Sequence, residues 1–143
     1  MIREFYLDRD LQKMAEIHAA NELPPQCLPN LEIEDQETKT KIPNPLFVVK
    51  SVLEHEGVPA MMCFLKLSAE IYLLVDHTVG TPEQRWEWLQ DFKNHIAQSA
   101  WQLGLEQITC WVPEEIEESF SKRLVDLGFE KSPWRSYSLN LED

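Results

Sequence analysis

Hydrophobic and polar positions follow clear periods along most of the chain. Residues 2–7 alternate enough to predict a short strand, and apolar residues recur at helical spacing over 11–18. Asp8 or Asp10 is placed to cap this helix through a side-chain oxygen, and the Pro24–Pro25 pair is expected to end it. The chain is therefore expected to open with a strand and a helix.

Residues 24–45 differ in character from what precedes them. Five prolines bracket the polar stretch 31–41, whose sequence LEIEDQETKTK is expected to form a short solvated helix. The segment is predicted to be a helical or loop insertion. Its mixed charges are typical of a solvated face, and a long loop of this kind also suits a lid or a recognition element.

Three apolar runs rich in branched and aromatic residues follow, at 46–53, 58–67 and 69–76. They are predicted to be adjacent antiparallel strands, the first two joined by the turn at 54–57. Positions 71–75 of the third run are apolar throughout, which predicts a central strand covered on both faces.

The next element has the most specific local signals. Thr81, Pro82 and Gln84 form a capping-box pattern that predicts a helix start, and Gly104 is placed to end that helix. Its apolar stripe consists of Leu89, Phe92, Ile96, Ala100 and Leu103. Trp101 projects from the opposite side, where it either packs under a loop or contacts another chain.

The remaining pattern predicts a strand at 107–113, a helix from Glu114 that closes at Gly128, and a final strand over 135–141. A length of 143 residues suits one domain, and no second domain is expected. The mixture of helices with mostly antiparallel strands predicts an α/β (α+β) fold with a central sheet flanked by helices.

Composition narrows the function classes. The chain holds 25 acidic and 13 basic residues, a net charge of −12 that disfavours nucleic acid, anionic membranes and polyanionic ligands and favours amines or basic proteins. Cys27, Cys63 and Cys110 have no Cys-x-x-Cys or zinc-ligand spacing, so no metal is expected. The two cysteines inside apolar runs, Cys63 and Cys110, are expected to pack as small hydrophobic residues.

The amino terminus is charged where a signal peptide needs an apolar core, and no apolar run is long enough to span a bilayer. A cytoplasmic location is therefore expected. The sequence also lacks Ser-His-Asp or Cys-His spacing, a dinucleotide fingerprint and a metal-ligand cluster, which leaves a hydrolytic or redox enzyme as a weak third option.

The order of elements and the segment 122–130, KRLVDLGFE, give a resemblance to a known family. A Leu-Gly-Phe ending after an amphipathic helix, followed by a tail strand, is similar to the ending of the GNAT acetyltransferases. The resemblance in element order covers essentially the whole chain. It implies the GNAT acyltransferase fold and an enzyme that uses acetyl-CoA.

The resemblance further implies that the coenzyme pairs with the central strand, here Leu73, Leu74 and Val75, and rests its pyrophosphate on the following loop, at Gly80, Thr81 and Arg85. This loop departs from the family pattern. Gly80 stands where the family has arginine or glutamine, Thr81 and Glu83 occupy the two small-residue positions, and Pro82 between them lacks an amide donor. The Glu83 carboxylate, if held about 4 Å from a phosphate charge, would weaken coenzyme binding by on the order of 4 kcal/mol at an effective dielectric near 20.

The catalytic side departs as well. The family often has a tyrosine four residues before the glycine of Gly-Phe, and here that position is Leu124, while Glu117 or Glu118 occupies the place of a common asparagine. Acetyl transfer to an amine needs a group to accept a proton, and Glu70, His77 and Glu114 are the candidate general bases, with Asp76 a further one.

Two hypotheses of different class follow. The first is a GNAT-like scaffold that acts as a non-catalytic binding or interaction module, with a protein, an amine or a second copy of the chain as partner. The second is a divergent acetyl-CoA-dependent N-acetyltransferase that holds its coenzyme through the strand backbone and Arg85. We favour the first, because the loop and the catalytic tyrosine both depart from the family pattern.

Overall fold

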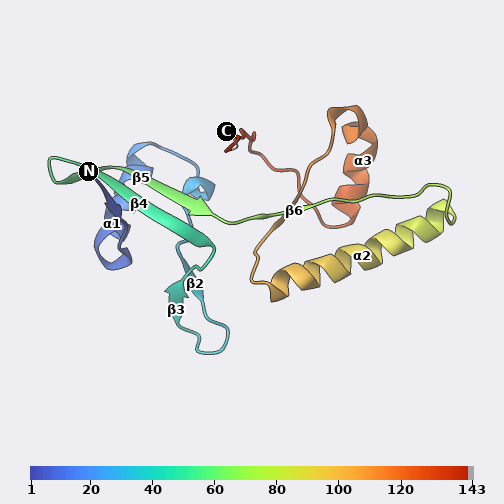
Figure 1. Cartoon of the computed structure of the whole chain (residues 1–143), viewed down its shortest axis with the longest axis horizontal. Helices are drawn as coiled ribbons and strands as arrows, with labels where there is room; N and C mark the ends of the chain where they lie inside the picture. The colour runs from blue at the N-terminus through green and yellow to red at the C-terminus, as the bar shows by residue number, and fades with distance from the viewer. Residues whose placement is uncertain (142–143) are drawn as a thin grey trace. The chain divides into compact units, whose positions relative to one another are not determined.

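The computed structural model describes residues 1–141 and divides the chain into two compact units, Met1–Ser68 and Ala69–Asp143. Each unit contains helices and strands, so the chain is mixed α+β, as the sequence predicted (Figure 1). Among the described residues, none of the helices has the length and apolar character needed to cross a bilayer.

The first unit contains a three-stranded antiparallel sheet in the order β1 (Ile2–Glu4), β4 (Phe47–His55), β5 (Val58–Lys66). Glu56 and Gly57 join β4 to β5 with φ of 52° and 77°, the left-handed backbone that a two-residue hairpin turn requires. The predicted hairpin between the first two apolar runs is confirmed.

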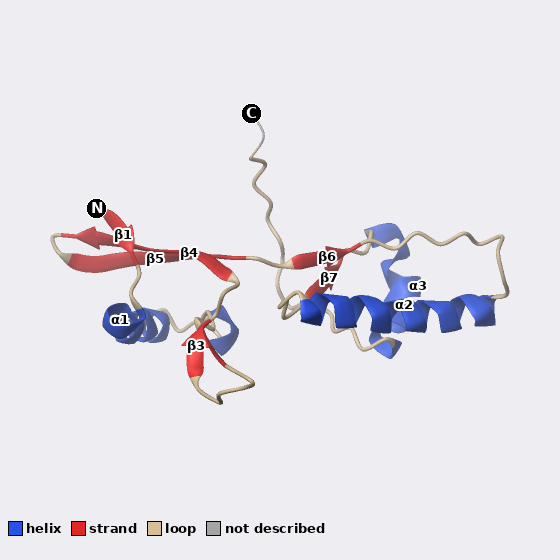
Figure 2. Cartoon of the chain, turned by 60° about the horizontal axis from the view of Figure 1, so that its bottom comes forward, coloured by secondary structure: helices blue, strands red, loops and turns tan. Residues whose placement is uncertain are grey.

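Helix α1 (Leu7–Ala20) lies against one face of this sheet (Figure 2). The core between them is built from Phe5, Met14, Leu31, Phe47 and Val52. The helix ends at Ala20, four residues before the proline pair that was expected to stop it, because Glu22 takes a left-handed backbone with φ of 53°.

Asp10 has a different role from the predicted cap. The residue that caps α1 is Tyr6, which makes no side-chain capping bond, and the Tyr6 amide instead donates to Asp10 Oδ2 at 2.9 Å. Asp10 is buried and receives two bonds of 2.7 Å from the Arg3 guanidinium, while Arg3 Nε donates to Glu54 Oε1 at 2.6 Å. The three side chains thereby link β1, α1 and β4.

The segment 24–45 holds a 3₁₀ turn (Pro25–Cys27) and an antiparallel hairpin of β2 (Glu32–Glu34) and β3 (Lys41–Pro43). The predicted solvated helix is therefore wrong. Asp35 accepts the amides of Glu37 and Thr38, an Asx turn that gives the chain an alternative to helix at this point, and these bonds lower the pKa of Asp35.

The second unit contains a parallel pair of β6 (Ala69–Ile71) and β7 (Ile108–Cys110), with α2 (Pro82–Gln102) between them in the chain and α3 (Glu114–Asp126) after β7. Both predicted helices are confirmed, and Gly104 and Gly128 follow them with φ of 80° and 94°. The sequence predicted antiparallel pairing for the run 69–76, and the structure gives it a parallel partner.

Two further strand predictions are wrong. Residues 72–75 continue the third apolar run but are not strand and are exposed, because the ladder with β7 ends at the pair Ile71–Cys110 and β7 then turns through Pro113 into α3. Residues 135–141 alternate as predicted but have no ladder partner among the described residues. A sequence of alternating polar and apolar residues forms a strand only where the edge of a sheet pairs with it.

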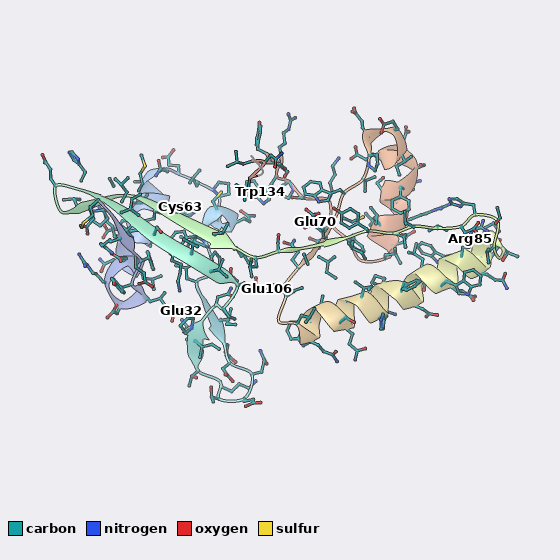
Figure 3. All side chains as sticks on the ribbon, in the orientation of Figure 1. Glu32, Cys63, Glu70, Arg85, Glu106 and Trp134 are labelled. Carbon is teal, nitrogen blue, oxygen red and sulfur yellow. The ribbon has the colours of Figure 1, made fainter. Side chains whose placement is uncertain are left out.

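Cys63 is exposed, which corrects the expectation that it packs in the core. Its neighbours Met62 and Phe64 are partly buried against the core of the first unit. Side chains alternate faces along a strand, so Cys63 lies on the outer face of β5, where Figure 3 labels it.

Candidate functional site

The loop before α2 is organised by its own side chains. Asp76 Oδ1 accepts the Thr78 amide at 2.9 Å and the Thr78 hydroxyl at 2.6 Å. These two bonds hold the pKa of Asp76 below its ordinary value, with smaller contributions from the charges of His77 and Arg85. The Asp76 carboxylate is thus committed to shaping the turn and is poorly suited to accept a proton.

Arg85 closes the loop from the first turns of α2. Its Nη1 donates to the carbonyl oxygens of Gly80 at 2.7 Å, Val79 at 3.2 Å and His77 at 3.3 Å (Figure 3). One of the three guanidinium nitrogens is therefore engaged by backbone of its own chain.

The predicted capping box is confirmed at the start of α2. Thr81 Oγ1 accepts the Gln84 amide at 3.2 Å, and Gln84 Oε1 accepts the Thr81 amide at 2.9 Å. Pro82 has no amide hydrogen. Within Thr81–Gln84 the Glu83 amide is therefore the one backbone donor that these bonds leave unengaged, and the Glu83 side chain beside it carries a carboxylate. A free helix N-terminus binds anions through its unbonded amides. At the start of α2 most of these amides are bonded by the capping box or missing at Pro82.

Gly80 is fixed by the ring of Trp88. Its φ is 71°, and a Cβ atom built there would lie 2.5 Å from Trp88 Cη2. Gly104, with φ of 80° and nothing within 4 Å of a built Cβ, offers the same backbone conformation without the contact.

We expect Gly80→Ala to destabilise the protein by about 1 to 2 kcal/mol, since a left-handed non-glycine residue costs that much and the indole must also move. Gly104→Ala is the matched control, with the backbone cost alone. Urea unfolding followed by tryptophan fluorescence measures both variants. A change in the emission maximum of the folded protein is expected for Gly80→Ala alone, and its absence would contradict the packing of Trp88 on this loop.

The three candidate general bases are not brought together by any hydrogen bond among the described residues. Glu70 lies in β6 and accepts a hydrogen bond of 2.8 Å from the Tyr72 hydroxyl, which raises the pKa of Tyr72 (Figure 3). His77 lies in the loop before α2, and Glu114 is the first residue of α3. The three candidates thus lie in three different elements of the second unit.

A cavity of about 230 Å³ lies inside the second unit, surrounded by residues 71–74, β7, α2 and α3. Its wall is formed by Ile71, Tyr72, Leu73, Leu74, Leu89, Phe92, Lys93, Ile96, Cys110, Phe120, Leu124, Leu127 and Phe129. Two of the residues predicted to hold the coenzyme, Leu73 and Leu74, thus line this cavity. Burial raises the pKa of the Cys110 thiol, so this part of the wall reacts slowly with electrophiles near neutral pH.

Lys93 is the feature of this cavity that the sequence analysis missed. It is half-buried, and no hydrogen bond or ion pair of its ammonium occurs within residues 1–141. The available signal was its position, because Leu89, Phe92, Lys93 and Ile96 share one helix face at spacings of three and four. A lysine on an apolar stripe breaks the pattern that the other three residues set.

No protein-family model, curated protein or solved structure matches the chain. In the part of the chain that the structure describes, no three histidine, cysteine or acidic side chains are grouped as metal ligands would be.

Proposed function

We propose that this chain is a GNAT-like protein that acts as a binding or interaction module, with a coenzyme loop closed by its own side chains. The observation that carries the proposal is the state of the α2 N-terminus. The resemblance requires backbone amides there for a pyrophosphate, and the Thr81–Gln84 box and Pro82 remove three of the four.

Three further contacts, all made by Arg85, point the same way. Arg85, the one nearby cation that could offset the Glu83 charge, donates to three loop carbonyls. A coenzyme that used Arg85 Nη1 would have to displace these bonds, and opening them leaves carbonyl oxygens without their donor. Micromolar binding amounts to only about 8 kcal/mol in total, so the combined cost would remove most of a useful affinity.

The test is a thermal unfolding scan with and without millimolar acetyl-CoA, repeated with free CoA. We expect no shift of the midpoint with either. A ligand at a hundredfold excess over its dissociation constant would add about 2.7 kcal/mol and raise the midpoint by roughly 5 to 11 °C. A shift of that size would overturn the proposal and support the divergent N-acetyltransferase.

Glu83→Gln separates the two reasons for the loss. If the carboxylate alone repels the phosphates, this variant gains a shift with acetyl-CoA. We expect it to remain as unresponsive as the wild-type chain, because the capping box and the Arg85 bonds are unchanged in it.

A further inference from the structure

The cavity between β7, α2 and α3 has an apolar wall, and among the described residues that line it Lys93 is the one cation. Apart from Lys93 and the Tyr72 hydroxyl, every side chain of the wall is a hydrocarbon, an aromatic ring or the protonated Cys110 thiol. The inner wall, which includes Ile71, Leu89 and Ile96, is partly buried, whereas Tyr72, Leu74 and Phe92 are exposed and form a rim. This is the composition of a small-molecule site with one orienting charge.

The volume sets the size of the occupant. An apolar cavity of about 150 Å³ holds benzene, so 230 Å³ has room for roughly nine carbon atoms. Leaving such a space empty sacrifices the contacts of every side chain around it, and filling it with hydrocarbon recovers them.

Lys93 determines the sign of the charge expected on the ligand. The half-buried Lys93 has no acidic partner among residues 1–141, and an anionic ligand would supply one. The protein as a whole carries a charge of −12 and therefore repels anions, so selection of an anion here has to come from a local cation.

We propose that this cavity binds a medium-chain carboxylate, with the hydrocarbon chain among the residues of α2, α3 and β7 and the carboxylate paired with the Lys93 ammonium. The proposal is independent of the coenzyme loop, since none of Asp76, Thr81 and Arg85 lines the cavity. It gives the second unit a ligand whether or not the chain binds CoA.

The experiment is isothermal titration of the full chain with octanoate, and with 1-octanol and octylamine as neutral and cationic controls of equal length. We expect octanoate to bind most tightly and octylamine not to bind, against the direction of the overall charge. Affinity should rise about fourfold for each methylene from butyrate to octanoate, and level off beyond about nine carbons.

Lys93→Met keeps the apolar stem and removes the charge. We expect it to weaken octanoate about tenfold to a hundredfold and to leave 1-octanol unchanged. Lys122→Met, an exposed lysine of α3 outside the cavity, is the matched control for net charge and should bind octanoate normally. Equal loss in both variants, or equal binding of octanoate and 1-octanol to the wild-type chain, would overturn the assignment.

Cys110 gives a second measurement that does not depend on the lysine variant. Replacing the exposed Cys27 and Cys63 by serine leaves Cys110, in the cavity wall, as the sole thiol. Octanoate is expected to slow the alkylation of this thiol. Labelling at an unchanged rate in saturating octanoate would place the ligand elsewhere and overturn the proposal.

Discussion

Asp10→Ala is expected to lower the free energy of unfolding by about 3 kcal/mol. Asp10 is 2 % exposed and accepts two bonds from the Arg3 guanidinium and one from the Tyr6 amide. Its removal leaves a largely buried cation without its main partner, and breaking a buried ion pair from one side typically costs 3 to 5 kcal/mol. The partial exposure of Arg3 places the expectation at the low end of that range.

Urea unfolding followed by far-UV circular dichroism measures the effect. Asp8→Ala is the matched control, because Asp8 is an exposed acid in the same first helical turn and its loss should cost less than about 1 kcal/mol. Equal stability of the two variants would show that the Arg3–Asp10 bonds do not hold β1 to α1.

The same ion pair gives a pH dependence. Bonding to Arg3 lowers the pKa of Asp10 from 3.8 to about 2. A carboxyl group with a lowered pKa in the folded state stabilises the fold fully above its unfolded pKa, and this contribution is lost as the pH falls from about 4 to 2. The wild-type chain should therefore lose stability more steeply over this interval than Asp10→Asn does.

The elements that the sequence predicted correctly are those with signals inside the element itself. Thr81 and Gln84 form the two bonds of a capping box within four residues, and Gly57 and Gly104 take the left-handed backbone that their turns require. Such signals depend on neighbouring residues alone, so the sequence contains all of the information needed.

The strand predictions that were wrong depend on partners distant in the sequence. Tyr72–Val75 has a strand-like composition, but β6 can extend only as far as β7 provides backbone groups, and β7 ends at Cys110. The hairpin at 32–43 was missed for a different reason, because its turn signals are local but its strands are not apolar. The Asx turn at Asp35 and the left-handed Lys39 connect two strands whose composition is too polar for periodicity to reveal.

The candidate site was predicted in its parts but not in their roles. Arg85 does lie at the loop that the resemblance indicated, yet its bonds are to the loop carbonyls. Asp10 was expected as a cap because its sequence position allowed it, and only the fold shows that Arg3 is near enough to bind it. The same limit applies to Lys93, since a cavity exists only once three elements meet around it.

Phe5→Ala is the second change with a large expected effect, a loss of about 3 to 5 kcal/mol. Phe5 is 3 % exposed, and its ring meets that of Phe64 edge to face with centroids 5.2 Å apart. Truncation removes the transfer free energy of the ring and leaves a cavity between β1, β5 and α1. The Phe5 amide still donates to the Lys50 carbonyl, so the loss is of packing and not of backbone pairing.

Far-UV circular dichroism during urea unfolding is the appropriate measurement, because all five tryptophans lie in the second unit and their fluorescence reports on that unit. Ile2→Ala, at a position of β1 that is 71 % exposed, should change the free energy of unfolding by less than about 0.5 kcal/mol. Phe5→Leu should cost less than Phe5→Ala, since leucine refills part of the space. If Phe5→Ala is no less stable than Ile2→Ala, the core of the first unit is not the one described by Phe5, Met14 and Val52.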